Sequence, residues 1–322
     1  MFCSSISSLF SLFSQTPKKL PAESSISPFY FNSELKKWLP LHRDQLDALP
    51  PSSGRKNLDD DVAFRTWKLC CYNIAGTDKP HSEHRVDALL HLLLQEDADV
   101  ICLQEVTPEF VDQMKKELWV QQSYILSDIE SQSLHPQGVL MLSRLPLHPF
   151  FATYLPSKQQ KKMLYADIYI NEQSVVRIAT SHLESSNHNI NFRQQQLESI
   201  KTVLLPESEK DKFMTSVICG DFNFTGSDED VALKKANFVD AWAHKYPKNE
   251  MGAGYTLGVN YPTSNPSRND RVYVCNHDKE IQWEAARIKL IGDKPITDSD
   301  ETKMFPSSHL GLSVTFTATW PN

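Results

Sequence analysis

The chain has 322 residues, 40% of them hydrophobic and 23% charged, which is an ordinary composition for a globular protein with a full-sized core. Its net charge of -7 excludes a surface that is basic throughout and coats nucleic acid without specificity, although it leaves room for a local basic groove. The six cysteines include no CxxC pair, so we expect neither a zinc site nor a disulfide framework. Unpaired cysteines of this kind indicate a protein from a reducing compartment.

Residues 1–60 are rich in Ser and Pro, and we expect them to form an N-terminal extension that is partly flexible, before one globular domain at residues 61–322. Lys18 and Lys19 follow the apolar part of this segment, which is not the charge order of a secretory signal, so we do not expect targeting by it. No apolar run approaches the ~20 residues that span a bilayer. We therefore expect an intracellular monomer without a membrane span, with nucleus and cytoplasm both left open.

From residue 64 onward, predicted strands alternate with predicted helices. Strands are expected at residues 64–76, 99–105, 138–144, 164–170, 174–182, 216–221, 271–275 and 309–320, where apolar residues cluster. Helices are expected after caps at Ser82 and Thr107 and around residues 197–203. The second of these has an apolar face made of Phe110, Val111, Met114 and Leu118. This order predicts a layered α/β protein in which two sheets pack face to face.

Polar residues stand where many of these strands begin or end. They are Asn73, Glu105, His182, Asp221, Asn223, Asp270 and His309. Each has a simpler interpretation when taken alone, such as a turn former, a helix cap, a surface ion pair or a histidine at a sheet edge. Taken together they favour one pocket, because strand ends can converge at one rim of a sandwich of sheets.

Three carboxylates, two amides and two imidazoles suit the metal-assisted hydrolysis of a phosphodiester. Mg²⁺ takes oxygen ligands and keeps several waters, so Glu105 is the candidate ligand, with the amide oxygen of Asn73 beside it. Asp221 could position and deprotonate the attacking water. Asn223 and His309 could donate hydrogen bonds to the phosphoryl oxygens, with Asp270 orienting the imidazole of His309.

Six motifs also occur in the order of a known superfamily: YNIAG, LQEV, TSHLES, GDFN, RNDR and SSHLGL. On these motifs the chain resembles the endonuclease/exonuclease/phosphatase superfamily. That resemblance implies a DNase I-like, four-layer α/β sandwich, with two packed mixed β-sheets flanked by helices, and a catalytic domain at residues 61–322. TSHLES with the Gln-rich segment after it, FVDAW and GYT are more similar to the tyrosyl-DNA phosphodiesterase 2 branch. That branch implies Mg²⁺-dependent, or Mn²⁺-dependent, removal of a tyrosyl adduct from the 5′ phosphate of a DNA end in DNA repair.

The resemblance assigns a role to each matching residue. It implies a metal site at Glu105 and Asn73, water activation by Asp221 with Asn223 as its partner, and phosphate binding by His309 with Asp270 orienting it. It further implies contacts to the scissile phosphate region from His182 and Ser185, and to the DNA backbone from Arg193.

The sequence departs from the family pattern at four positions. Tyr72 stands in place of Trp, Ala75 and Ser308 stand in place of Asp, and Leu257 stands where the branch often has Trp. Two other functions therefore stay open. One is another hydrolase on this scaffold, such as an abasic-site endonuclease, a deadenylase, or a phosphatase for phosphoinositide or sphingolipid head groups. The other is a binding module that kept the fold without turnover.

Overall fold

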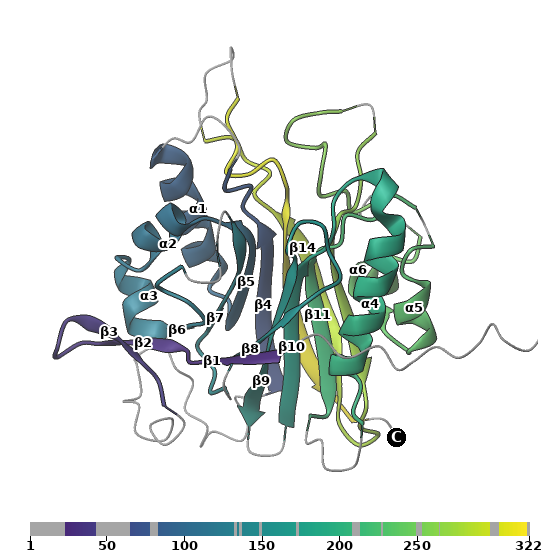
Figure 1. The fold of residues 1–322 in the computed structure, drawn as a ribbon, viewed down its shortest axis with the longest axis horizontal. Helices are drawn as coiled ribbons and strands as arrows, with labels where there is room; N and C mark the ends of the chain where they lie inside the picture. The colour runs from purple at the N-terminus through teal and green to yellow at the C-terminus, as the bar shows by residue number, and fades with distance from the viewer. Residues whose placement is uncertain are drawn as a thin grey trace, which may run out of the picture.

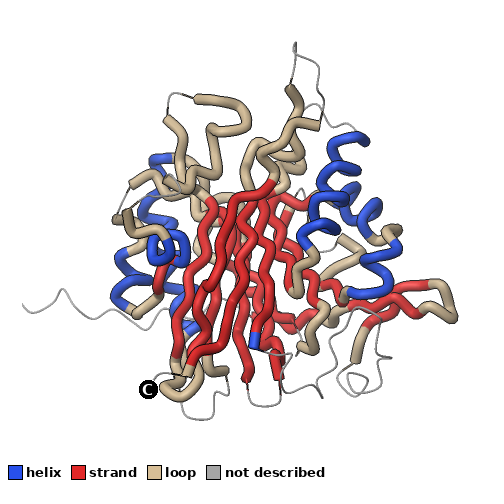
Figure 2. Tube along the Cα trace, turned by 180° about the vertical axis from the view of Figure 1, so that it is seen from behind, coloured by secondary structure: helices blue, strands red, loops and turns tan. Residues whose placement is uncertain are grey.

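Two mixed β-sheets packed face to face form the centre of the protein (Figures 1 and 2). The computed structural model describes residues 23–42, 65–77, 83–131, 134, 137–147, 150–171, 174–207, 213–226, 228–248, 253–263, 265–296 and 303–320. None of the helices in these ranges combines the length and the apolar character that crossing a membrane requires. Ser82, the predicted cap of the first helix, lies outside the described residues.

The first sheet has seven strands, in the spatial order β1 (Glu23–Ile26), β8 (Phe150–Tyr154), β9 (Lys162–Asn171), β10 (Ser174–His182), β11 (Thr215–Asp221), β13 (Asp270–Asn276) and β12 (Val239–Asp240). The second has eight, in the order β14 (Gln282–Ile291), β15 (Gly311–Thr319), β4 (Thr66–Asn73), β5 (Val100–Val106), β7 (Gly138–Ser143), β6 (Ile125–Leu126), β2 (Phe29–Asn32) and β3 (Lys37–Pro40). Each sheet contains one parallel pair, β10 with β11 and β4 with β5, among antiparallel ones.

Helices cover the outer face of each sheet (Figure 1). On the eight-stranded sheet these are α1 (Glu83–Glu96), α2 (Pro108–Met114) and α3 (Leu118–Ser123), and on the seven-stranded sheet they are α4 (Ile190–Leu204) and α5 (Val231–Lys235). The short helix α6 (Ala241–Lys245) places Trp242 in the core between the sheets. The predicted architecture of two mixed sheets flanked by helices is confirmed.

The second predicted helix needs a correction. Thr107 caps α2 as expected, because its hydroxyl accepts a hydrogen bond from the N–H of Phe110. The helix ends at Met114, however, and a turn separates it from α3, so Leu118 does not share its apolar face. The side chain of Leu118 is 69% exposed instead.

Strands from residues 23–42 lie at the edges of both sheets. β1 pairs with β8, and β2 pairs with β6 and β3. The hydroxyl of Tyr165 on β9 donates to the carboxylate of Glu23 at 2.6 Å. The division of the chain at residue 60 stays a prediction, and this part of the segment adds strands to the sandwich.

Candidate active site

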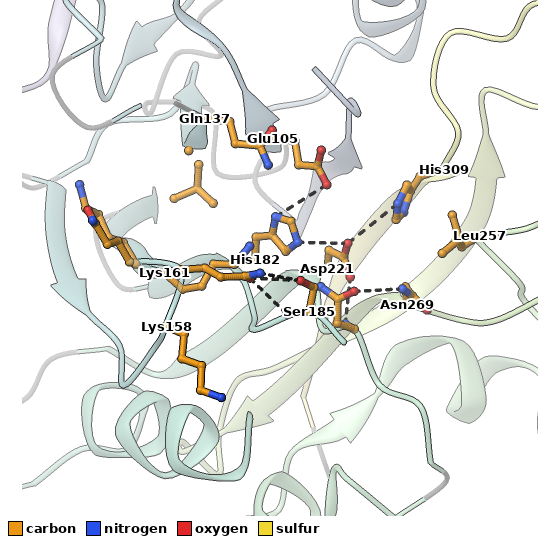
Figure 3. A pocket seen from close by; sticks show the side chains of 16 residues that line it. Glu105, Gln137, Lys158, Lys161, His182, Ser185, Asp221, Leu257, Asn269 and His309 are labelled. Atoms are coloured by element: carbon orange, nitrogen blue, oxygen red, sulfur yellow. Dashed lines mark hydrogen bonds and ion pairs between the residues drawn. The ribbon is translucent and has the colours of Figure 1, made fainter. Parts of the chain in front are cut away.

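A pocket of about 540 Å³ opens where strands of both sheets end, and most of the predicted site residues meet there (Figure 3). Six of them line it: Glu105, His182, Ser185, Asp221, Asn223 and His309. Asn73 and Asp270 lie behind this lining, are fully buried, and make hydrogen bonds to it. Of the predicted residues, Arg193 does not reach the pocket.

Asp221 is the centre of the arrangement. Its Oδ1 accepts the N–H of Asn223 at 2.9 Å, which is the Asx turn that the sequence allows, and its Oδ2 accepts from the amide of Asn73 at 2.9 Å. The imidazoles of His182 and His309 lie on either side of Oδ2, at 3.6 and 4.0 Å (Figure 3). The turn and the site are therefore the same structure, since the turn holds the carboxylate of Asp221 rigidly.

Gly220 explains how Asp221 reaches this position. Its φ of +143° lies in a region that glycine adopts readily, and a Cβ there would overlap the carbonyl oxygen of Ser181 on the neighbouring strand. The absence of a side chain lets β11 approach β10 closely, and Asp221 is thereby aligned with His182 across the parallel pair.

Glu105 reaches the pocket through an irregularity in β5. The register between β5 and β7 shifts between Leu103 and Val106, and the φ of Glu105 is +54°, which is uncommon for a residue with a side chain. Regular alternation would turn Glu105 toward the helices, as it turns Leu103. The bulge turns its carboxylate into the pocket instead, with 17% of the side chain exposed.

Asn73 joins the two carboxylates through its side-chain amide. Its Nδ2 donates to Oε1 of Glu105 at 3.0 Å and to Oδ2 of Asp221 at 2.9 Å, while its Oδ1 accepts the N–H of Ala75 at 2.9 Å. Its amide nitrogen, which carries no free lone pair for a metal, thus faces the carboxylates. In this arrangement Asn73 orients the two carboxylates, and metal ligation through its oxygen stays a prediction.

His309 is held by Asp270, as predicted. The ring nitrogen Nδ1 lies 2.8 Å from Oδ2 of Asp270, whose side chain is fully buried. Burial alone lowers the pKa of an imidazole, but the carboxylates of Asp270, Asp221 and Glu105 outweigh it and raise the pKa of His309 to about 9. His309 therefore carries a positive charge at neutral pH.

His182 behaves in the opposite way. Burial lowers its pKa to about 4, with the charges of Lys161 and His309 acting in the same direction and the charge of Asp221 acting against them. It is therefore neutral at neutral pH, with Nδ1 4.0 Å from Oε1 of Glu105 and Nε2 3.6 Å from Oδ2 of Asp221. Two histidines at one site thus take different charges because only His309 has a dedicated carboxylate partner.

Asn223 and Ser185 complete the predicted lining. The φ of Asn223 is +50°, a conformation that Asn tolerates better than most residues, and its amide donates to the carbonyl of Leu183 at 3.1 Å. Ser185 exchanges hydrogen bonds with the amide of Gln159, which lies between β8 and β9 and also lines the pocket.

Arg193 requires a second correction. Its side chain is completely buried, where it forms an ion pair with Glu229 at 2.6 Å and donates to the carbonyls of Glu184 and Ser186. A guanidinium in this position cannot contact a DNA backbone. Arg193 instead fixes the backbone that follows His182, so the predicted DNA contact is not formed by this buried side chain. The sequence did not indicate the burial because the partner Glu229 lies 36 residues away.

A basic wall escaped the sequence analysis. Lys158 and Lys161, from the segment between β8 and β9, and Lys162, the first residue of β9, line one side of the pocket. Burial lowers the pKa of Lys161, while Asp221, Glu105 and Glu184 act in the other direction. The run SKQQKK was the available signal, but a charge run between two strands usually lies in solvent.

The donor atoms in the pocket fit a hard divalent cation at Glu105. Oxygen or nitrogen atoms of Glu105, His182 and Asp221 lie within 4.8 Å of one another. A second group with the same spacing contains Asp221, Asp270 and His309, but a protonated His309 would repel a cation there. The first group is therefore the candidate metal centre, with Glu105 as the ligand open to the pocket.

Comparison with known proteins agrees with this geometry. Residues 70–309, more than half of the chain, match the Endonuclease/Exonuclease/phosphatase family. The chain belongs to the endonuclease/exonuclease/phosphatase family. Within it, the chain is 29% identical to tyrosyl-DNA phosphodiesterase 2 of Xenopus laevis over 82% of this chain and 69% of that protein. It is 25% identical to tyrosyl-DNA phosphodiesterase 2 of Xenopus tropicalis over 82% of this chain and 68% of that protein.

Solved structures show the same fold. A humanized D. rerio TDP2 superposes with a TM-score of 0.65 at 21% identity, covering 78% of this chain and 99% of that chain. D. rerio TDP2 complexed with a single-strand DNA product superposes with a TM-score of 0.63 at 21% identity, covering 78% of this chain and 98% of that chain. The fold predicted from the motifs is thus the fold of the endonuclease/exonuclease/phosphatase family.

Proposed function

We propose that this member of the family hydrolyses the phosphodiester that joins a tyrosine to the 5′ phosphate of a DNA end, with Mg²⁺ or Mn²⁺ as cofactor. The observation that carries the proposal is the position of Asp221 between a neutral His182 and a charged His309, with Glu105 beside them. The similarity to tyrosyl-DNA phosphodiesterase 2 over 82% of the chain supports the choice of substrate.

The residues divide the work of an in-line displacement at phosphorus. Asp221, fixed by Asn73 and by the N–H of Asn223, holds and deprotonates the attacking water. His309, charged and held by Asp270, donates a hydrogen bond to a phosphoryl oxygen as negative charge develops there. A divalent ion bound at Glu105 would neutralise phosphoryl charge and stabilise the leaving oxygen.

The wall with Lys158, Lys161 and Lys162 gives the site a side that attracts a phosphate chain. At a net charge of -7, these lysines offset the repulsion that the rest of the protein exerts on a polyanionic substrate. Opposite this wall, the apolar side chain of Leu257 lines the pocket.

The proposal is tested by incubating the protein with a 5′-phosphotyrosyl oligonucleotide with and without Mg²⁺. An abasic-site duplex and a small phosphodiester serve as comparison substrates. We expect Mg²⁺-dependent release of tyrosine that Asp221→Asn abolishes and Asp112→Asn leaves unchanged, since Asp112 is 60% exposed on α2. Turnover of another substrate without release of tyrosine would assign the chain to another hydrolase of the family.

If the protein cleaves none of these substrates, the result would favour a binding module. Thermal melting then tests whether the metal centre is intact. An ion that binds the folded state alone raises its stability by about 2.7 kcal/mol at a hundredfold excess over Kd. We expect this rise for the wild type with Mg²⁺ and its loss in Glu105→Gln. Melting without any response to Mg²⁺ would contradict the assignment of Glu105.

A further inference from the structure

The active site is divided between the two sheets. Asn73 and Glu105 come from β4 and β5 of the eight-stranded sheet, and His309 stands two residues before β15 of the same sheet. His182 and Asp221 end β10 and β11 of the seven-stranded sheet. The distance between Glu105 and the two residues that face it therefore depends on how precisely the sheets are placed against each other.

Most of the core between the sheets is apolar, formed by side chains such as Leu69, Ile178 and Val217. Apolar contacts are not directional, so this core holds the sheets together without fixing their offset to a fraction of an ångström. Catalytic geometry is far more demanding, since a displacement of about 1 Å can lower the rate about 100-fold. Directional contacts across the interface are needed close to the site, and the bond from Asn73 on β4 to Asp221 on β11 is one of them.

Gln104 and Thr180 make such a contact in the layer directly below the reactive groups. Nε2 of Gln104 on β5 donates to the hydroxyl of Thr180 on β10 at 2.9 Å, and both residues are fully buried. The same nitrogen also donates to the carbonyl of Cys102 at 3.3 Å, and Oε1 lies 3.8 Å from the thiol of Cys71. The carbonyl of Cys102 orients this amide because it can accept only from Nε2, whereas the thiol of Cys71 lies equally close to Nε2, at 3.7 Å, and to Oε1.

The location of the pair matters more than its strength. Gln104 directly precedes Glu105 and is the last residue of β5 before the bulge that turns Glu105 into the pocket. Thr180 stands two residues before His182, so both side chains lie on the same face of β10. The bond therefore joins the support of Glu105 to the support of His182, whose Nδ1 lies 4.0 Å from Oε1 of Glu105.

We infer that Gln104 and Thr180 are positioning residues, which together with Asn73 set the separation between Glu105 on one sheet and His182 with Asp221 on the other. Neither residue lines the pocket, so both act through the residues that do. The inference rests on the proposed reaction centre, but it does not depend on which phosphodiester the enzyme cleaves.

The test compares Thr180→Val and Gln104→Met, which keep the size of the side chains and remove the bond, with two reference variants. Thr180→Ser keeps the hydroxyl. Thr215→Val is the matched control, because Thr215 is equally buried and donates to Oδ1 of Asn276 at 2.7 Å at the opposite end of β11. Turnover, KM, melting temperature and the NMR shifts of the histidine rings are measured for each variant.

We expect Thr180→Val and Gln104→Met each to lower kcat about 10-fold to 100-fold with KM within about twofold, and the double variant to lose no more than either. Thr180→Ser should stay within about threefold of the wild type. Thr215→Val should keep its kcat whatever its melting temperature. The ring shifts of His182 should move in Thr180→Val and not in Thr215→Val.

An unchanged kcat in Thr180→Val and Gln104→Met, additive losses in the double variant, or an equal loss in Thr215→Val would overturn the inference. If Thr180→Val does not fold, Gln104→Met and Thr180→Ser still decide it. A wild type that cleaves none of the substrates would overturn the proposed function alone, because the shifts of the His182 ring report on positioning without turnover.

Discussion

Asp270→Asn tests the electrostatic account of the site most directly. The substitution keeps an oxygen that can accept from Nδ1 of His309 and removes the negative charge that does most to raise the pKa of that imidazole to about 9. Burial is then the largest influence left, and we expect the pKa of His309 to fall to its ordinary value of 6.5 or below.

The expected loss of activity follows from the charged fraction of His309. At pH 7.5 a group with a pKa of about 9 is ~97% protonated, and a group with a pKa of 6.5 is only ~10% protonated. If the charged ring binds the phosphoryl oxygen, Asp270→Asn should lower the rate at pH 7.5 at least about 10-fold. The wild type should keep its rate until the pH approaches 9, whereas the variant should lose activity above pH 6.5 and recover it below.

The free energy of unfolding should also depend on pH through the protonation of His309. The pKa of His309 is higher in the folded state than its ordinary value of 6.5, so its contribution is fully present below pH 6.5 and is lost as the pH rises through about 9. That interval corresponds to about 3 kcal/mol, and the difference in melting temperature between wild type and variant should shrink across it.

The assay is a pH–rate profile of both proteins with Asp230→Asn as a control. Asp230 is also buried, but it accepts from the hydroxyl of Tyr273 and lies outside the pocket. An identical upper pH limit in wild type and Asp270→Asn would refute the role given to the pair of Asp270 and His309.

Three further predictions concern the frame of the pocket. Gly220→Ala should destabilise the fold by more than ~3 kcal/mol in thermal melting, because φ is +143° and the new Cβ overlaps a backbone oxygen, whereas Gly226→Ala, with no neighbour closer than 4.0 Å, should be nearly neutral. Arg193→Met should lower the free energy of unfolding by about 3–5 kcal/mol, because Glu229 would remain buried without its partner. Well below the melting temperature the variant should keep the wild-type KM for DNA, and a higher KM would show that Arg193 does contact DNA. Lys161→Met should raise KM about 10-fold and reduce the salt dependence of binding by about one charge in a titration with KCl, and an unchanged slope would remove Lys161 from the phosphate-binding wall.

The strands could be predicted wherever their alternation is regular. Each of the eight predicted ranges overlaps a strand, but seven strands were missed, and these are β1, β2, β3, β6, β8, β12 and β14. Trp283 and Ile288 on β14 are both buried although five residues separate them, because a register shift between Ala285 and Arg287 changes the alternation. A bulge of this kind leaves no mark in the composition of a segment, so periodicity could not reveal it.

The site could be predicted as a set of residues but not as a set of orientations. That Glu105, Asp221 and His309 converge follows from strands that end at one rim. The direction in which the amide of Asn73 points depends on the N–H of Ala75, and the burial of Arg193 depends on Glu229. Both are properties of the folded environment, which a single sequence does not display.

The position of β15 in its sheet has a consequence for the folding of the enzyme during synthesis. β15 lies between β14 and β4, so the strand made last among those described enters the interior of its sheet rather than its edge. Just before it, the hydroxyl of Ser307 donates to the carbonyl of Asn73, a contact between residues 234 positions apart. Closing so long a loop is slow, and it comes after most of the sandwich has been synthesised. Nascent chains on the ribosome should therefore remain inactive until β15 has emerged, because His309 and Ser307 reach their partners only then.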